Sequence, residues 1–386
     1  MQIPEGRLPV VVVEAPTSPG AGFRESAPGY WRLRADDAPE RVARLVAEGR
    51  HAWLAFAPQP PPGDLPPETD DFRELQVWLD PSPGFGFTEA AAWDGGDGAH
   101  VRVADVEYAW DADHEDLEAT VDAWVAGEEW DYAFHGDAVL GILVAGVNGY
   151  GVDGAAPGVE ALVVHPFLDG LADEDYDVAE AIAVAAAALA PGDVLLIEQQ
   201  FWANGGYCPV SVDPSVRAAI EAAAAAGIVV VEPAGNGAQD LDDVVWAGAF
   251  AGDGGSVLVG AGASPLSGYD PRSWIGGSNY GSGVHVQGWM ESIVTTSGEG
   301  WSDLWFPSGD PRQAYTAAFG GTSGASAQVA AAAAIVQSVA IARNGEPWAP
   351  EDVRAALAST GDPPAGSVPL GPRPDVRRLL RTYFLR

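Results

Sequence analysis

The stretch "FGGTSGASAQVAAAAAIVQSVA" at residues 319–340 places two glycines, a threonine and a serine directly before a long alanine-rich run. Such a run predicts a helix buried against other elements, because small side chains allow close packing. Ser and Thr are favoured at helix starts, so Ser323 has one reading as a capping residue. A second reading is a nucleophilic hydroxyl held at a helix N-terminus. The rest of the chain must decide between the two readings.

The composition limits the classes of partner. The chain has 386 residues with 55 acidic and 19 basic side chains, every base is Arg, and the formal charge is -36. A surface of this sign repels phosphate, so nucleic acid and anionic membranes are not expected as partners. One cysteine, Cys208, excludes an internal disulfide. The N-terminus lacks the pattern of a secretory signal, so we expect a soluble protein, cytoplasmic rather than secreted.

Proline and acidic residues divide the chain near Pro66. Residues 1–66 read as a small α/β unit with strands at "LPVVVVE", "YWRL" and "HAWLAF", a helix over residues 37–49, and a proline-rich linker. Residues 67–386 form the main domain. From about residue 98, short apolar strands alternate with helices, and this alternation predicts an α/β fold with a mainly parallel sheet flanked by helices on both faces.

Catalytic groups of such sheets gather at the carboxyl ends of strands. Asp105 ends the predicted strand "VRVA", His135 starts the predicted helix "HGDAVLGILVAG", and Ser323 starts the alanine-rich helix. Each residue alone has an ordinary explanation as a cap or surface group. Together they supply a hydroxyl, a base and an orienting acid, which is the set that acyl transfer needs.

Four segments resemble the subtilisin-like serine peptidases, the subtilase family, and they occur in that family's order over roughly residues 75–360. They are "VRVADVEYAWDADHEDL", "HGDAVLGILVAGVNGYGVDGAAPGV", "VVVEPAGNG" and "GGTSGASAQVA". The resemblance implies a serine endopeptidase in which Ser323 attacks the peptide carbonyl, His135 is the base and Asp105 orients the imidazole. It also implies that Asn236 stabilises the oxyanion, with the Ser323 backbone N–H as second donor.

The resemblance has departures as well. Val106 and Glu107 follow Asp105, where the family usually has a small hydroxyl residue and a glycine, and Ala327 stands where proline is usual. The strand "LLIEQQ" carries Glu198, Gln199 and Gln200 where the family lines its main specificity pocket.

Glu198, Gln200 and Gly235 are therefore candidate substrate-binding residues, and Glu198 in that pocket favours a basic or polar P1 side chain. The alternative is that Glu198 points away and is solvated or paired, since neighbours along a strand face opposite sides.

The chemistry needs no cofactor. The resemblance makes Asp116 a weak calcium candidate, although "DADHEDLEATVD" fails the EF-hand pattern. The N-terminal unit reads either as an inhibitory pro-segment or as a permanent accessory domain. The expected partner is a peptide or protein substrate. Two rival readings are a catalytically weak scaffold that binds peptides or a partner protein, and an esterase or transacylase with the same triad.

Overall fold

The computed structural model describes residues 10–55, 69–118, 121–172, 175–250 and 254–385. The chain divides into two units between residues 68 and 69. The predicted boundary at Pro66 and most of the proline-rich linker lie outside the described residues. Each unit is considered by itself below.

The N-terminal unit is a four-stranded antiparallel sheet with one helix, in the strand order β2-β3-β1-β4. Side chains from the central strand β1 and from α1 form its small core, among them Val11, Val13 and Ala38. The sequence predicted all of these elements except β2. Their bounds are β1 Val10–Glu14, β2 Arg24–Ala27, β3 Tyr30–Arg34, α1 Ala38–Ala47 and β4 His51–Leu54.

The large unit is built on a seven-stranded sheet in the order β13-β12-β11-β8-β5-β7-β6, and every neighbouring pair is parallel. The strands are short and apolar because both faces of the sheet are covered. The predicted α/β fold with a mainly parallel sheet is confirmed. The strands are β5 Arg102–Val106, β6 Val121–Ala126, β7 Glu160–Val164, β8 Val194–Ile197, β11 Val229–Pro233, β12 Ser256–Gly262 and β13 Val286–Trp289.

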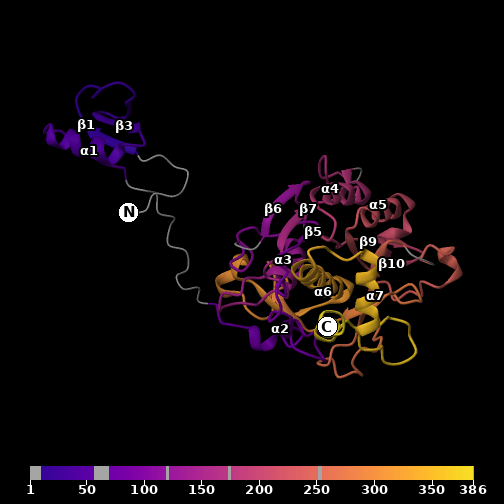
Figure 1. Ribbon diagram of the computed structural model, residues 1–386. Coiled ribbons are helices and arrows are strands. Elements are labelled where there is room, and N and C mark those ends of the chain that lie inside the picture. Colours follow the sequence, from indigo (N-terminus) through magenta and orange to yellow (C-terminus); the bar gives the residue numbers. More distant parts are fainter. Residues whose placement is uncertain (1–9, 56–68, 119–120, 173–174, 251–253, 386) are drawn as a thin grey trace. The chain divides into compact units, whose positions relative to one another are not determined.

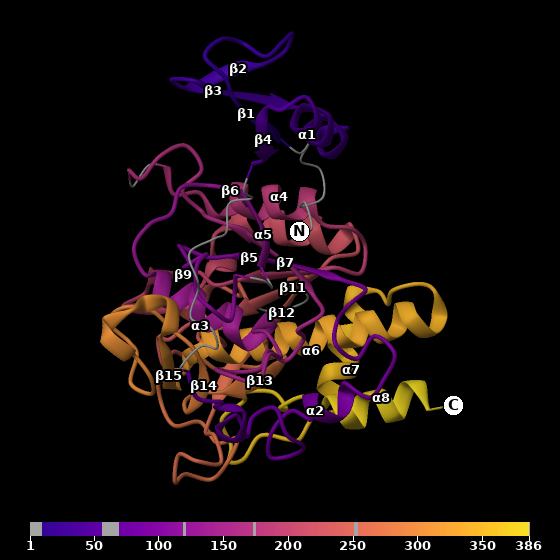
Figure 2. The same cartoon turned by 90° about the vertical axis from the view of Figure 1, so that its left-hand side faces the viewer.

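Helices α3 (Ala133–Val144) and α6 (Gly321–Asn344) pack together on one face of this sheet, and α4 (Val178–Ala188) and α5 (Pro214–Ala225) pack on the other (Figure 2). Alternate residues of each strand serve the two faces. In β8, for example, Leu196 belongs to the core on the α6 side, whereas its neighbours face α4 and α5. Whether a residue occupies an odd or an even position along the strand, here called strand parity, therefore determines which pair of helices its side chain contacts.

Helix α6 passes through the centre of the large unit (Figures 1 and 2). By length and composition it could cross a membrane, but 89% of its most apolar 18-residue window is buried inside the domain. A buried, alanine-rich helix of this kind is the core helix of a folded domain rather than evidence of a span. The prediction from residues 319–340 that the alanine-rich run packs against other elements is confirmed.

The remaining elements border the main sheet. Helices α7 and α8 pack against α6, and the apolar side chains Leu379, Leu380 and Phe384 of α8 enter the core. Cys208 is buried in the β9–β10 hairpin, where burial first and then the charge of Glu232 raise the pKa of its thiol to about 11. The bounds are α2 Phe87–Ala90, β9 Gln200–Ala203, β10 Gly206–Pro209, β14 Ile293–Thr296, β15 Tyr315–Phe319, α7 Pro350–Thr360 and α8 Val376–Phe384. Short 3-10 turns are η1 Arg73–Leu75, η3 Val210–Val212, η4 Val244–Trp246, η5 Pro307–Gly309 and η6 Pro311–Gln313.

Helix α3 is held close to strand β14 by a glycine. The hydroxyls of Thr295 and Thr296 donate to the carbonyls of Ala138 and Asp137 on α3. A Cβ at Gly141 would collide with both threonine side chains and with the backbone of Thr296. Backbone atoms cannot move aside cheaply, so this position requires glycine.

We expect Gly141→Ala to lower the free energy of unfolding by about 1–3 kcal/mol through overpacking, although alanine raises helix propensity. Urea unfolding followed by circular dichroism measures the change. Gly254→Ala is the matched control, because a Cβ at Gly254 meets nothing within 4 Å. Equal stabilities of the two variants would contradict the packing argument.

Candidate active site

Strand β5, helix α3 and helix α6 carry the three predicted catalytic side chains, and α3 packs against α6 in the large unit. Helix α6 begins at Gly321 after the N-cap Gly320, and no side chain caps it. Ser323 therefore lies inside the first turn and is not the N-cap residue. The interpretation of Ser323 as a helix cap is excluded. Its side chain is partly exposed.

His135 lies in the first turn of α3 and its ring is 22% exposed. The ring Nδ1 lies 2.6 Å from Oε2 of Glu107, whose side chain is fully buried. A hydrogen bond to a carboxylate fixes the tautomer that carries the proton on Nδ1, so Nε2 is left as the basic nitrogen. Gly136 allows this approach, because a Cβ there would collide with the Ala109 carbonyl and the Glu107 side chain.

The prediction that Asp105 orients His135 is wrong in this structure, where Glu107 takes that place. Asp105 lies within β5, beside Val163 of β7 and Leu196 of β8, and is only 1% exposed. Neither of its carboxylate oxygens accepts a hydrogen bond from any described residue. Strand β5 runs through Val106, so the first residue beyond the strand is Glu107.

A signal in the sequence pointed to Glu107. Asp105 and Glu107 are two residues apart and so face the same side of the sheet, the side that α3 covers. Applied to the whole stretch VRVADV at residues 101–106, in which apolar residues extend through Val106, the rule that functional groups follow the strand end selects Glu107 rather than Asp105. The prediction ended the strand at the first acidic residue and thereby missed it.

Asp105 and His135 both have raised pKa values, for different reasons. Burial, reinforced by the nearby charge of Glu107, raises the pKa of Asp105 well above its usual value. Burial alone would lower the pKa of His135, but the charge of Glu107, its hydrogen bond and the charge of Glu198 outweigh burial and raise that pKa to about 9. The same buried carboxyl group of Glu107 therefore raises the pKa of both Asp105 and His135.

Phe319 contacts the His135 imidazole and precedes Ser323 by four residues. The imidazole packs edge-on against the Phe319 ring with 5.6 Å between the ring centroids, and Phe319 ends β15 just before α6 begins. In the described part of the chain, the Ser323 hydroxyl forms no hydrogen bond with the imidazole. Catalytic hydrogen bonds of this kind often tighten only when substrate is bound. The pairing of Ser323 with His135 stays a prediction.

Asn236 lies against the first turn of α6. Its Oδ1 accepts hydrogen bonds from the backbone N–H of Thr322 at 2.9 Å and from the Thr322 hydroxyl at 3.2 Å. Two donors on the oxygen fix the orientation of the amide, so the Nδ2 group is directed away from Thr322. Gln200 Oε1 accepts from the Asn236 backbone N–H at 3.0 Å and from Nδ2 at 3.4 Å. Gln200 therefore holds Asn236 in place.

Glu198 does not occupy an open pocket. It is 4% exposed, and its Oε1 accepts a 2.7 Å hydrogen bond from Ser326, one turn after Ser323 on α6. The expectation that Glu198 selects a basic P1 side chain is contradicted, because strand parity turns the carboxyl toward α6. Burial raises the pKa of Glu198 well above its usual value, with the His135 charge opposing and the Asp105 and Glu107 charges adding to that shift.

Gln199 and Gly235 both form hydrogen bonds with other groups of the protein. Gln199 faces the other side of the sheet, where its Oε1 accepts from the Tyr176 hydroxyl at 2.7 Å. Gly235 is buried with φ +89° and accepts a hydrogen bond from the Asn279 backbone N–H. A positive φ of this size favours glycine, and the bend it makes directs Asn236 toward α6.

Asp116 accepts hydrogen bonds from protein donors, and a calcium site there stays a prediction. Asp116 is 2% exposed; Oδ1 accepts from the Asn148 amide, and Oδ2 accepts from the Val152 N–H and the Tyr315 hydroxyl. These neighbours present donors, whereas calcium requires six to eight oxygen ligands. Burial is the main cause that raises the pKa of Asp116 to about 7. No group of three His, Cys, Asp or Glu within the described ranges could hold a metal ion.

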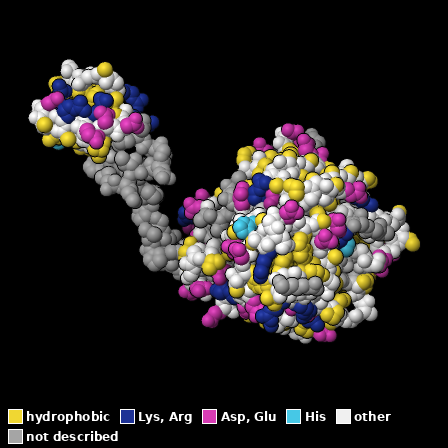
Figure 3. Space-filling model, viewed as in Figure 1, with side chains coloured by type: hydrophobic (Ala, Val, Ile, Leu, Met, Phe, Trp, Pro, Cys, Tyr) yellow, Lys and Arg dark blue, Asp and Glu magenta, His cyan; other side chains and the backbone are white. Residues whose placement is uncertain are grey.

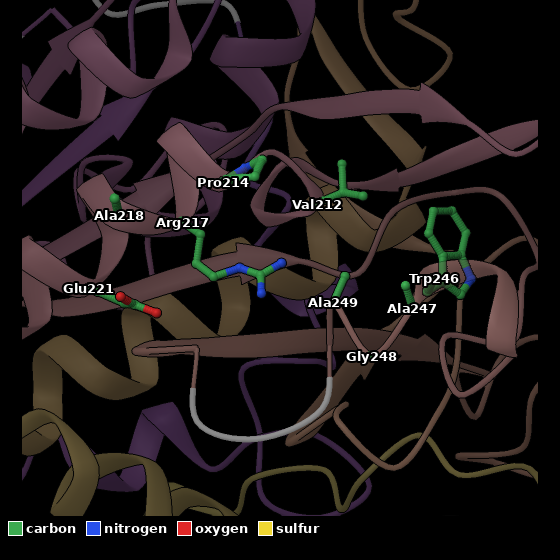
Figure 4. Close-up of a pocket in the computed structure, with 9 residues that line it drawn as sticks. All are labelled: Val212, Pro214, Arg217, Ala218, Glu221, Trp246, Ala247, Gly248 and Ala249. Carbon is green, nitrogen blue, oxygen red and sulfur yellow. The ribbon is translucent and has the colours of Figure 1, made fainter.

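A hollow elsewhere on the large unit contains none of these groups. Arg217 and Glu221 of α5 face Trp246 across it (Figure 4). The Arg217 guanidinium donates to the Ser211 carbonyl at 2.7 Å and so is engaged by the protein itself. This hollow is separate from the site around His135.

A model of the subtilase family (peptidase family S8) matches residues 95–371. The match spans more than half of the chain, so the chain belongs to this family and is a serine endopeptidase, with peptides or proteins as substrates. No curated protein sequence matches the chain.

Solved structures show the same fold. A protease structure from Pseudoalteromonas arctica matches with a TM-score of 0.59 at 19% identity, covering 81% of this chain and 98% of that one. The prenylagaramide maturation protease PagA gives a TM-score of 0.57 at 18% identity, with 77% of this chain and 97% of that one covered. The self-cleaved protease domain of PatA gives 0.54 at 22% identity, with 74% and 96% covered.

Proposed function

We propose that this subtilase hydrolyses peptide bonds with Ser323 as nucleophile, His135 as general base and Glu107, rather than Asp105, as the orienting acid. The observation that carries the proposal is the 2.6 Å contact between His135 Nδ1 and the buried Glu107 carboxylate. It supplies the two properties that a base in acyl transfer needs, a fixed tautomer and a counter-charge for the imidazolium.

In the proposed first step, the Ser323 hydroxyl attacks the peptide carbonyl and its proton moves to His135 Nε2. The resulting imidazolium then gives that proton to the leaving amine, and water repeats the sequence to release the acyl group. Glu107 keeps its charge throughout and stabilises the imidazolium.

The developing oxyanion is proposed to bind the Nδ2 group of Asn236 and the backbone N–H of Ser323. Support comes from Thr322 and Gln200, which hold the Asn236 amide from both ends. Donors fixed before the reaction stabilise the transition state without having to reorganise. The Ser323 N–H lies in the first turn of α6, where helix N–H groups have no partner within the helix and the dipole favours negative charge.

Glu198 is proposed to position α6 rather than to touch substrate. Its hydrogen bond from Ser326 ties the second turn of the helix to the end of β8. Ser326 also contacts the carbonyls of Thr322 and Ser323. The Glu198–Ser326 pair therefore fixes the turn that carries the nucleophile.

We expect the wild-type protein to react with a fluorophosphonate probe and to cleave peptides, and Ser323→Ala to lose both activities. Labelling should fall to background and kcat should fall by about 10^3-fold or more. Gel fluorescence and peptide turnover measure the two effects. A wild-type protein that binds peptides but neither labels nor cleaves them would instead support the scaffold reading, and turnover of simple esters alone would support the esterase reading.

Asp105 lies in β5 and Glu107 directly follows it, so substitutions of these two residues form a matched pair of variants. We expect Glu107→Gln to lower kcat/KM by about 10^3- to 10^4-fold, because the amide neither fixes the productive tautomer nor balances the imidazolium. Asp105→Asn should keep kcat/KM within about threefold of the wild type, since Asp105 touches neither His135 nor substrate in this arrangement. Kinetics on one peptide substrate decides the assignment, and the reverse order of effects would overturn it.

We also expect an alkaline activity profile. Because the pKa of His135 is raised to about 9, most of the imidazole is protonated at neutral pH and cannot act as a base. The value of kcat/KM should therefore rise with pH through a midpoint near that value. NMR titration of the imidazole signals, of which the chain has only six, gives the pKa directly.

The same titration has an internal control. Glu107→Gln should move the His135 pKa down toward the value of a free imidazole, because it removes the neighbouring charge. A midpoint at or below about 6.5, the ordinary value of a histidine, in the wild type would show that Glu107 does not stabilise the imidazolium.

A further inference from the structure

A second hollow, of about 610 Å³, lies beside the first turn of α3. Six acidic residues line it, and none of its described lining residues is Lys, Arg or His. Trp110, Tyr132 and Phe134 supply aromatic surface. The acidic residues are Asp111, Asp113, Glu129, Asp131, Asp137 and Glu299.

The hollow adjoins the proposed catalytic base. Phe134 and Asp137 line it and flank His135 on the first turn of α3. A chain of ring contacts also connects the two places: Phe134 packs on Trp301 at 5.2 Å, and Trp301 packs on Phe319 at 6.0 Å. Phe319 is the residue whose ring meets the imidazole. A side chain in the hollow would therefore belong to a substrate residue close to the bond that is cleaved.

Asp137 provides an observation independent of the acidic cluster. Its side chain is completely buried, and Oδ1 accepts a 2.6 Å hydrogen bond from the Asp111 backbone N–H. The other oxygen, Oδ2, is buried without a hydrogen-bond partner among the described residues. An unpartnered buried carboxylate oxygen costs free energy unless a donor or a proton satisfies it. Asp137 is also one of the residues that line the hollow.

The lining selects an organic cation. The described residues contain no grouping of three acidic or imidazole side chains suited to a metal ion. The aromatic rings offer faces for a cation, and the carboxylates offer charge and acceptors, a combination that suits guanidinium and ammonium groups. The formal charge of -36 adds a long-range attraction for basic peptides, and magenta acidic side chains are spread over the face in Figure 3.

We propose that this hollow is a specificity subsite that binds a basic side chain, Arg or Lys, of the peptide substrate. The inference rests on the proposed function, because it places the subsite next to the bond that Ser323 attacks. The carboxylates beside α3, rather than Glu198, would then select basic side chains, because Glu198 is buried against α6.

Peptides that contain arginine or its neutral isostere citrulline test the proposal. A set of internally quenched peptides carries this exchange at each of three positions on either side of the cleaved bond. We expect kcat/KM to fall by about tenfold or more for citrulline at one position. The variant Glu129→Gln/Glu299→Gln should reduce the difference in kcat/KM between the arginine and citrulline peptides to about threefold or less.

The variants are chosen to fold. Glu129 and Glu299 are exposed, and neither side chain forms a hydrogen bond or ion pair with another described residue. Glu351→Gln/Asp352→Asn on α7 removes two exposed charges away from the hollow and serves as the matched control. It should keep the full discrimination. Equal losses in both variants would show that net charge alone attracts basic peptides, and this would overturn the subsite.

Binding to Ser323→Ala, measured by fluorescence anisotropy, separates failure of the subsite from failure of the proposed function. The arginine peptide should bind about tenfold or more tightly than the citrulline peptide, whether or not the wild-type protein cleaves it. Tighter binding without cleavage would uphold the subsite and refute the catalytic proposal. Cleavage without any arginine preference, in turnover or in binding, would refute the subsite and leave the catalytic proposal standing.

Discussion

The hydrogen bond between His135 and the buried carboxylate of Glu107 is the interaction on which the candidate site depends. The two partners come from different elements, the end of a central strand and the first turn of a helix that covers the sheet. Their approach needs the glycine at position 136, and the helix itself is seated on β14 through the glycine at position 141. The proposed catalytic imidazole is thus oriented by backbone packing, and, against the opposing effect of burial, Glu107 makes the largest contribution to its raised pKa, with Glu198 adding to it.

Much of the fold follows from local patterns in the chain. The alternation of short apolar strands and helices predicts the parallel sheet, and the alanine-rich run after residue 320 predicts the buried helix α6. Strand β2 of the N-terminal unit has no comparable signal, because its sequence "RESA" is polar and its side chains are exposed. Such an edge strand forms because β3 offers it hydrogen bonds, a condition that no local pattern reveals.

The site was predicted less completely than the fold. His135, Asn236 and Ser323 start or follow elements with clear periodicity, and the structure places them around the start of α6. Glu107 was missed because two acidic residues on one strand face satisfy the same pattern, and only the end of β5 separates them. For Glu198 the sequence left two directions open, and the contact with Ser326 resolves the choice. The direction of a carboxyl group near a strand end, as for Glu107 and Glu198, therefore depends on the residue at which the strand ends.

Helix α6 has a practical meaning for redesign of this enzyme. Its residues from Gly324 to Ala340 are buried, and several are alanines with no room for a larger group. A larger side chain there would displace the helix and, with it, Ser323, the proposed nucleophile. Engineers who seek new cleavage preferences should therefore leave this helix, Glu107 and Asn236 unchanged and vary exposed loop positions.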